Sequence, residues 1–301
     1  MSHLVRGPGL RCEVQVDRGA RIVSLCGDDG HEWLAPSRRT ASPGRGQSFV
    51  REGMGGWDEV APTVQADAGM TDTAGNALAE LPDHGDIWNV PWTLDSATPA
   101  GLTASVQLSS MPVLLERTIA ASATGLSIRY RASTAAAGQF PLLWCAHPQF
   151  AAADGATVAV ESAGAPITPQ LIEMYPLAGR SLAFPDRPLH DGMAPGSSVK
   201  AFVAPAVRAD AAVLHVGPRR GPRRALRIGW DAAQLPYLGL FWDNGEFAAG
   251  PVLAIEPSTA WGERLSGAVA QQRVPTVSRR RPLEWTLSVS VEAGAAPLKT
   301  G

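Results

Sequence analysis

The sequence predicts an all-β protein, and three observations support that fold class. Several short segments alternate apolar and polar residues, as a strand does when one of its faces is buried. The 31 Gly and 25 Pro residues are spread along the chain, which suits many short strands joined by turns. No long segment repeats apolar residues at helical spacing. Together these features favour one sandwich-like body of largely antiparallel strands, with no domain boundary within residues 1–301.

Five segments are the clearest strand candidates. The alternation of apolar and polar residues is strongest in four of them, at 11–16, 125–131, 225–230 and 285–291. The fifth, 252–255, is a continuous apolar run of the kind expected in a strand covered on both faces.

Turn-rich segments separate these strands. Loops are predicted at 35–47, 185–199 and 217–224, and a frayed tail is predicted after residue 291. The basic clusters at 217–224 and 279–281 are interpreted as solvated hairpin tips, because short charge runs are common on protein surfaces.

Composition excludes several classes of function. A hydrophobic fraction of 45% is ample for a folded core, and 26 Lys and Arg against 28 Asp and Glu argue against a nucleic-acid partner. The three cysteines have no metal-ligand spacing, so we expect free thiols and no metal. Neither a signal peptide nor a membrane-spanning run is visible in the sequence. We therefore expect a cytoplasmic protein, monomeric or homodimeric, with no membrane partner.

Two ionisable residues stand at the ends of apolar strands. His147 precedes Pro148, and a proline is expected to interrupt a strand. Glu256 follows the apolar run 252–255, and a carboxylate buried there is costly unless it is paired or has a task. A histidine in this setting is more often a core residue with a satisfied ring, and Glu256 alone fits an exposed strand-end acid equally well.

A second histidine and a glycine-rich segment add polar candidates. His84 is flanked by acids and followed by Trp88. In the segment 51–63, two glycines let the backbone approach a ligand, while Trp57 beside Asp58 and Glu59 combines an apolar ring with hydroxyl-binding carboxylates. That combination is the chemistry of carbohydrate recognition, although a glycine turn beside a buried tryptophan explains the same residues.

Taken in order, these segments resemble the aldose 1-epimerase (galactose mutarotase-like) superfamily over about residues 12–290. The matching segments are Gly-Ala-Arg-Ile-Val-Ser-Leu at 19–25, Gly-Gly-Trp-Asp-Glu-Val-Ala-Pro-Thr at 55–63, Asp-His-Gly at 83–85 followed by Trp88, His-Pro at 147–148, and Ala-Ile-Glu-Pro-Ser-Thr at 254–259. The resemblance implies a β-supersandwich that binds a sugar on a sheet face and interconverts α and β anomers without a cofactor.

Carried over residue by residue, the resemblance implies three catalytic roles. Glu256 is the general base at the anomeric hydroxyl, His147 is the general acid at the ring oxygen, and His84 assists there or binds a neighbouring hydroxyl. Such groups act best when their pKa lies near the working pH, so Glu256 is expected to have a pKa raised by burial.

The resemblance departs from well-studied members in its sugar contacts. Where those members have an asparagine-arginine pair, this chain has Gly-Gly-Trp-Asp-Glu at 55–59, so Asp58 or Glu59 is expected to bind hydroxyls instead. Arg51, Trp57 and Trp88 are further expected substrate contacts. Where they have a sugar-binding aspartate, it offers Lys200.

Two alternatives to an isomerase acting on a free aldose stay open. One is a non-catalytic sugar-binding or regulatory protein on the same fold. The other is an epimerase of sugar phosphates, which needs basic residues such as Arg51 and Lys200 converging on the pocket. A lyase is disfavoured, because such enzymes usually add a large helical domain.

Overall fold

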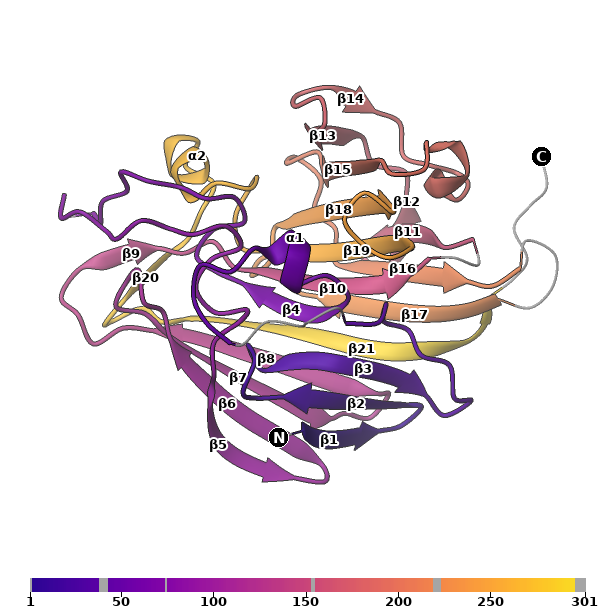
Figure 1. The fold of residues 1–301 in the computed structure, drawn as a ribbon, viewed down its shortest axis with the longest axis horizontal. Helices are drawn as coiled ribbons and strands as arrows, with labels where there is room; N and C mark the ends of the chain where they lie inside the picture. The colour runs from indigo at the N-terminus through magenta and orange to yellow at the C-terminus, as the bar shows by residue number, and fades with distance from the viewer. Residues whose placement is uncertain (1, 38–42, 74, 153–154, 219–222, 296–301) are drawn as a thin grey trace.

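The chain folds into two large antiparallel sheets and one small one (Figure 1). The computed structural model describes residues 2–37, 43–73, 75–152, 155–218 and 223–295. Its ten-stranded sheet has the order β1 (Ser2–Gly7), β2 (Leu10–Gln15), β3 (Arg21–Gly27), β4 (Gly56–Val60), β10 (Cys145–Ala151), β19 (Pro251–Ser258), β18 (Tyr237–Asn244), β15 (Ser198–Val203), β13 (Leu171–Tyr175) and β14 (Ser181–Leu182).

The second large sheet has nine strands. Its order is β12 (Ala165–Ile167), β11 (Thr157–Ser162), β16 (Ala211–Val216), β17 (Arg223–Trp230), β21 (Leu283–Ala295), β8 (Leu126–Ser133), β7 (Leu114–Ala121), β6 (Gly101–Gln107) and β5 (Thr93–Thr98). A two-stranded sheet joins β20 (Thr276–Ser278) to β9 (Gln139–Pro141).

Helical structure in the described residues is short. It comprises α1 (Phe49–Glu52), α2 (Leu265–Ala270) and the 3-10 turn η1 (Leu189–Gly192). Figure 1 shows α1 lying in front of β4 and β10, at the middle of the ten-stranded sheet. No helix in this part of the chain is long and apolar enough to cross a membrane.

The hydrophobic core lies between the two large sheets. Buried side chains from both, such as Leu25 and Phe150 of one sheet and Ile128 and Leu287 of the other, belong to one continuous cluster. The alternating burial along β8 shows why its sequence forms a strand here: every second side chain enters that core and the others do not. The result is the all-β sandwich expected from the sequence.

The predicted strands are confirmed, with two corrections at segment ends. All five segments lie within or largely overlap β2, β8, β17, β19 and β21, and the expected free cysteines are free and buried. The tail prediction is wrong at its start, because β21 continues to Ala295 and pairs there with Arg223; residues 296–301 lie outside the described part of the chain. The predicted loop 185–199 contains η1, and β15 begins inside it at Ser198.

The two basic clusters differ in their surroundings. The Arg279–Arg281 cluster is exposed, as expected of a surface turn. The prediction of a solvated tip at 217–224 is wrong for Arg223, whose buried guanidinium donates to the carbonyl oxygens of Gly155 at 2.6 Å and His215 at 2.8 Å. Both bonds come from Nη2, and these carbonyl oxygens offset part of the cost of burying the charge. Residues 219–222 and 38–42, also within predicted loops, lie outside the described residues.

Candidate active site

One row of side chains across the ten-stranded sheet carries the main polar groups of the site. The antiparallel register between β10 and β19 sets His147 opposite Glu256. On one side of this pair β4 sets Asp58 beside His147, and on the other side β18 sets Gly239 beside Glu256. Opposite residues in such a ladder point to the same face of the sheet. Residues distant in the sequence are thereby gathered on the face that α1 covers (Figure 1).

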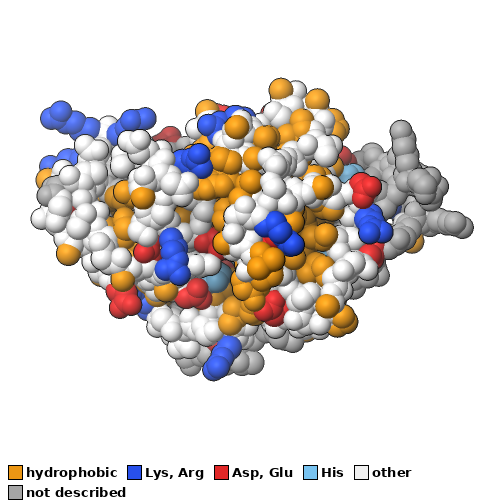
Figure 2. All heavy atoms as spheres, turned by 90° about the horizontal axis from the view of Figure 1, so that it is seen from above, with side chains coloured by type: hydrophobic (Ala, Val, Ile, Leu, Met, Phe, Trp, Pro, Cys, Tyr) orange, Lys and Arg blue, Asp and Glu red, His pale blue; other side chains and the backbone are white. Residues whose placement is uncertain are grey.

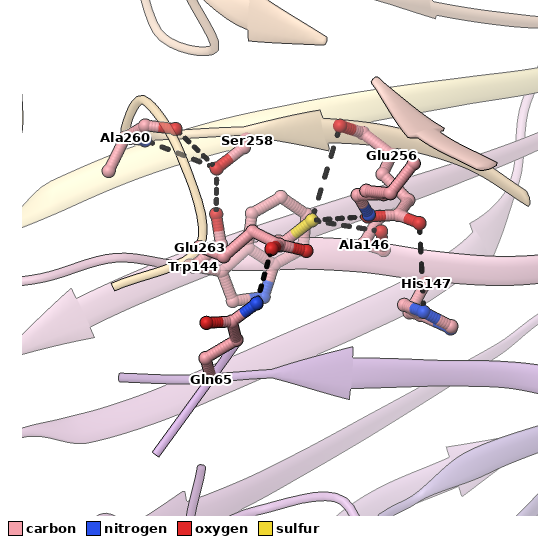
Figure 3. Close-up of polar contacts among 10 residues, drawn as sticks. Gln65, Trp144, Ala146, His147, Glu256, Ser258, Ala260 and Glu263 are labelled. Atoms are coloured by element: carbon pink, nitrogen blue, oxygen red, sulfur yellow. Dashed lines mark hydrogen bonds and ion pairs between the residues drawn. The ribbon is translucent and has the colours of Figure 1, made fainter. Parts of the chain in front are cut away.

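The Glu256 carboxylate and the His147 imidazole meet in this row (Figure 3). Glu256 Oε1 lies 3.6 Å from His147 Nε2, and the Glu256 side chain has no exposed surface. Among the described residues none donates a hydrogen bond to Oε1, and none pairs with His147 Nδ1. A buried carboxylate oxygen without a donor is unusual in a folded protein and calls for an explanation, of which a catalytic role is one.

Lys200 neutralises the other oxygen of the same carboxylate. Its ammonium group forms an ion pair with Glu256 Oε2, reaching from β15 over β18. The strand between them presents Gly239 at this level, where even a Cβ atom would lie only 3.4 Å from Glu256 Oε2. A side chain larger than alanine at Gly239 would therefore occupy space beside the carboxylate.

The charges set the pKa values of the three groups. Burial alone raises the pKa of Glu256, but Lys200 and His147 outweigh burial and hold that pKa below its usual 4.5. Burial lowers the pKa of Lys200, yet Glu256 and Glu263 outweigh it and raise that pKa. Burial lowers the pKa of His147 to about 3. At neutral pH the site thus contains an ionised Glu256, a charged Lys200 and a neutral His147.

His84 lies on the opposite wall, in the segment between β4 and β5. Its φ of +58° is in the left-handed region, which is uncommon for residues other than glycine. Its Nδ1 lies 2.9 Å from Asp83 Oδ2, and its ring stacks on Phe49 of α1 at 3.9 Å between centroids. The His84 and His147 rings are 5.8 Å apart.

A pocket of about 180 Å³ opens over these groups. Its lining combines polar and charged groups with apolar and aromatic walls: Phe49, Val50, Met54, Val64, Gln65, Asp83, His84, His147, Tyr175, Lys200, Phe241, Phe247 and Glu263. Figure 2 shows a face where hydrophobic side chains gather around a histidine and several charged groups. No cluster of three or more His, Cys, Asp or Glu side chains within the described residues is arranged to hold a metal ion.

The structure brings together all three candidate catalytic residues, Glu256, His147 and His84. His84 and His147 line the pocket, as does Lys200, an expected substrate contact. Glu256 lies directly behind His147 and Lys200. The pKa of Glu256 moves opposite to the expected direction, because the expectation did not include Lys200 as its partner.

The Trp57-Asp58-Glu59 segment does not line the pocket, contrary to the sugar-binding role expected for it. Trp57 lies in the core between the sheets, and Glu59, on the same face of β4, receives hydrogen bonds from Arg117 at 2.9 Å and Tyr130 at 2.8 Å. Asp58 faces the site row but is fully buried beside Arg21, at 3.3 Å. These acids therefore neutralise buried arginines.

The other two expected contacts also lie outside the pocket lining. Arg51 is exposed on α1. Trp88 is buried in a small cluster behind Phe49, with ring centroids 5.1 Å apart, so it supports the pocket wall.

Several lining residues were missed at the sequence level. Phe241 and Phe247 come from β18 and the turn after it, and Gln65 and Glu263 come from loops. The segment around Phe241 has the sequence of a strand, which could have indicated that residue. Glu263 follows Gly262 in a loop, and no sequence feature distinguishes it from an ordinary surface acid.

The protein is an all-β sandwich in which a row of acidic and basic side chains and a pocket lie on one sheet face.

Over 97% of its length the chain is similar to a galactose mutarotase-like protein from Lactobacillus casei ATCC 334, all of which it covers, with 18% identity and a TM-score of 0.71. Over 97% of its length it is also similar to 99% of a candidate aldose 1-epimerase from Escherichia coli K12, with 15% identity and a TM-score of 0.70. A galactose mutarotase related enzyme from Lactobacillus acidophilus matches over 100% of both chains, with 12% identity and a TM-score of 0.68.

These likenesses establish the fold. The chain is a β-supersandwich of the galactose mutarotase type, as the sequence resemblance implied. No protein-family model and no curated protein matches the sequence. At such low identities activity does not follow from fold, and the function has to be argued from the site.

Proposed function

We propose that this protein is an aldose 1-epimerase that interconverts the α and β anomers of a free aldose. The observation that carries the proposal is the unsatisfied Oε1 of Glu256, ionised, buried and 3.6 Å from His147 Nε2 beside the pocket. An anomeric hydroxyl that enters the pocket can donate its hydrogen bond to this oxygen. The carboxylate then takes the proton as a general base while the ring opens.

The pocket walls suit a sugar. Phe49, Phe241 and Phe247 present aromatic surface to the C–H faces of a pyranose, and Gln65, Asp83 and His84 offer polar atoms for its hydroxyls. A mixture of apolar walls and a few placed polar groups is typical of small-molecule sites.

The role of His147 differs from the one implied by the family resemblance. With a pKa lowered to about 3, its ring is neutral at physiological pH and is a weak acid. A neutral ring still contacts Glu256 and can orient the anomeric hydroxyl by a hydrogen bond. The proton for the ring oxygen then has to come from another group.

A sugar phosphate is disfavoured as the substrate. Lys200 is the one cationic side chain among the described pocket-lining residues, and its charge is held by Glu256. Arg51, the second basic residue considered, is exposed on α1. A phosphate would add negative charge to a site with no further cation.

The proposal is tested by polarimetry of freshly dissolved α-D-glucose, α-D-galactose and a panel of other aldoses, with and without the protein. The expected result is a faster approach to anomeric equilibrium for at least one sugar. No acceleration for any sugar that binds in a thermal-shift assay contradicts catalysis and supports the non-catalytic sugar-binding alternative.

A further inference from the structure

Glu263 is a second carboxyl group in the pocket and is held in one place. Its side chain lines the pocket, and its Oε2 accepts a hydrogen bond of 2.6 Å from Gln65 Nε2 (Figure 3). Its backbone carbonyl accepts from the N–H groups of Val64 at 2.9 Å and Gln65 at 2.8 Å. The loop after β19 is thereby fixed to the loop after β4, and the carboxyl stays at the pocket wall.

The charges around Glu263 determine where a proton resides. Glu263 interacts electrostatically with Lys200 and Glu256, and more weakly with His84 and Asp83. The Lys200 ammonium is already in contact with Glu256, and one ammonium neutralises one carboxylate. Two carboxyl groups in one site disfavour each other's charged form, so the one without the direct ion pair keeps its proton to higher pH.

Of the two carboxyl groups, Glu263 is the one that keeps its proton to higher pH. Glu256 has the direct ion pair, so its charged form is the better stabilised of the two. The neighbour of Glu263 is instead the neutral amide of Gln65, whose oxygen accepts a bond of 3.1 Å from Arg264 Nε. Glu263 is also partly open to the pocket, as a group that exchanges a proton with a substrate must be.

We propose that Glu263 is the second catalytic residue of the site, the general acid that delivers a proton to the ring oxygen of the sugar. This inference rests on the proposed aldose 1-epimerase activity. It gives the reaction two carboxyl groups, with ionised Glu256 as the base and protonated Glu263 as the acid, while neutral His147 orients the hydroxyl.

Both protons that move during ring opening and reclosure are accounted for by Glu256 and Glu263. Glu256 takes the proton of the anomeric hydroxyl, the C1–O1 bond becomes a carbonyl, the C1–O5 bond breaks, and O5 takes the proton of Glu263. The open-chain aldehyde rotates about C1–C2. Reclosure returns one proton to Glu263 from the attacking hydroxyl and one from Glu256 to O1, so both residues regain their starting states.

The pKa directions agree with this assignment. Burial raises the pKa of Glu263; Lys200 opposes that rise and Glu256 adds to it, whereas the pKa of Glu256 is lowered. Two carboxyl groups in one site whose pKa values are pushed apart commonly divide into an acid and a base.

The test is the pH profile of kcat/KM for mutarotation by the wild type and the Glu263→Gln variant. Its alkaline limb reports loss of the proton from the acid of the free enzyme. We expect Glu263→Gln to lower kcat/KM about 10²–10⁴-fold and to abolish that limb. Glu263→Asp, which keeps the carboxyl group, should recover part of the rate and restore the limb.

A second variant keeps the inference testable if Glu263→Gln folds poorly. Gln65→Met removes the donor to Glu263 Oε2 at similar volume, which disfavours the charged carboxylate. The alkaline limb should therefore move to higher pH. The matched control is Glu284→Gln on β21, far more exposed and paired with Arg131, which should leave both the rate and the limb unchanged.

The outcomes separate the two proposals. A wild type that accelerates no aldose overturns the proposed function itself. An active wild type whose rate and alkaline limb survive Glu263→Gln, with the limb unmoved in Gln65→Met, overturns the role of Glu263 alone. An alkaline limb that disappears in His84→Asn but not in Glu263→Gln also overturns the role of Glu263.

Discussion

The ammonium group of Lys200 and the carboxylate of Glu256 form a buried ion pair that joins β15 to β19 over the glycine of the intervening strand. Both side chains are almost completely withdrawn from solvent. Isolated charges at this depth are very unfavourable, so each group depends on the other. The pair holds Oε2 of the carboxylate, while Oε1 accepts no hydrogen bond from the described residues.

Removing Lys200 is expected to destabilise the protein strongly. In Lys200→Met the Glu256 carboxylate loses its cation, and breaking one partner of a buried pair typically costs about 3–5 kcal/mol. Urea unfolding at pH 7 measures the change in the free energy of unfolding. The double variant Lys200→Met/Glu256→Gln should recover part of the loss, because no uncompensated charge remains. A Lys200→Met variant as stable as the wild type contradicts the buried pair.

His147 is expected to make the fold sensitive to acid. Its pKa is about 3 in the folded protein, against 6.5 ordinarily, so between these values the unfolded chain binds more protons than the folded one. The contribution of His147 to the free energy of unfolding is therefore fully present above about pH 6.5. It is lost as the pH falls towards 3, by up to about 1.4 kcal/mol per pH unit. Unfolding free energies of the wild type and His147→Asn at pH 7, 6 and 5 test this. The slope of the variant should be smaller, and equal slopes contradict the lowered pKa.

The histidines should differ in their importance for turnover. His147→Asn removes the ring that contacts Glu256 and is expected to lower kcat about 10²-fold, the lower end of the range for a positioned acid–base group. His215 on β16 and His31 near Trp33 lie away from the pocket, so His215→Asn and His31→Asn should change kcat less than about twofold. Comparable losses in all three variants would argue that His147 acts only through stability.

The fold follows from the sequence because its signals are local. The alternation in 125–131 predicts β8, and the apolar run 252–255 predicts the doubly covered strand β19. Histidine before proline and glutamate at the end of an apolar run are likewise local features, and they led to His147 and Glu256. The register that sets them opposite each other involves strands more than a hundred residues apart, which pattern alone does not specify.

The predicted sugar contacts at 57–59 lie away from the pocket for the same physical reason. The acids of Trp57-Asp58-Glu59 look like hydroxyl ligands, but the charges that engage them, Arg21 and Arg117, come from β3 and β7. Whether a carboxylate in a strand faces a pocket or a buried arginine depends on that long-range pairing. Glu263 was missed because a loop acid gains its importance only from Lys200 and Gln65 beside it.

The role of Glu256 as the base is tested by the mutarotation rate of Glu256→Gln, measured by polarimetry on the aldose that the wild type turns over fastest. The amide keeps the shape of the side chain but is not a base, and Lys200 loses its counter-charge, so the assay is run well below the unfolding temperature of the variant. We expect a rate about 10²–10⁴-fold below that of the wild type, with the rate of Glu284→Gln unchanged. A folded Glu256→Gln variant with wild-type turnover would contradict the assignment of Glu256 as the base.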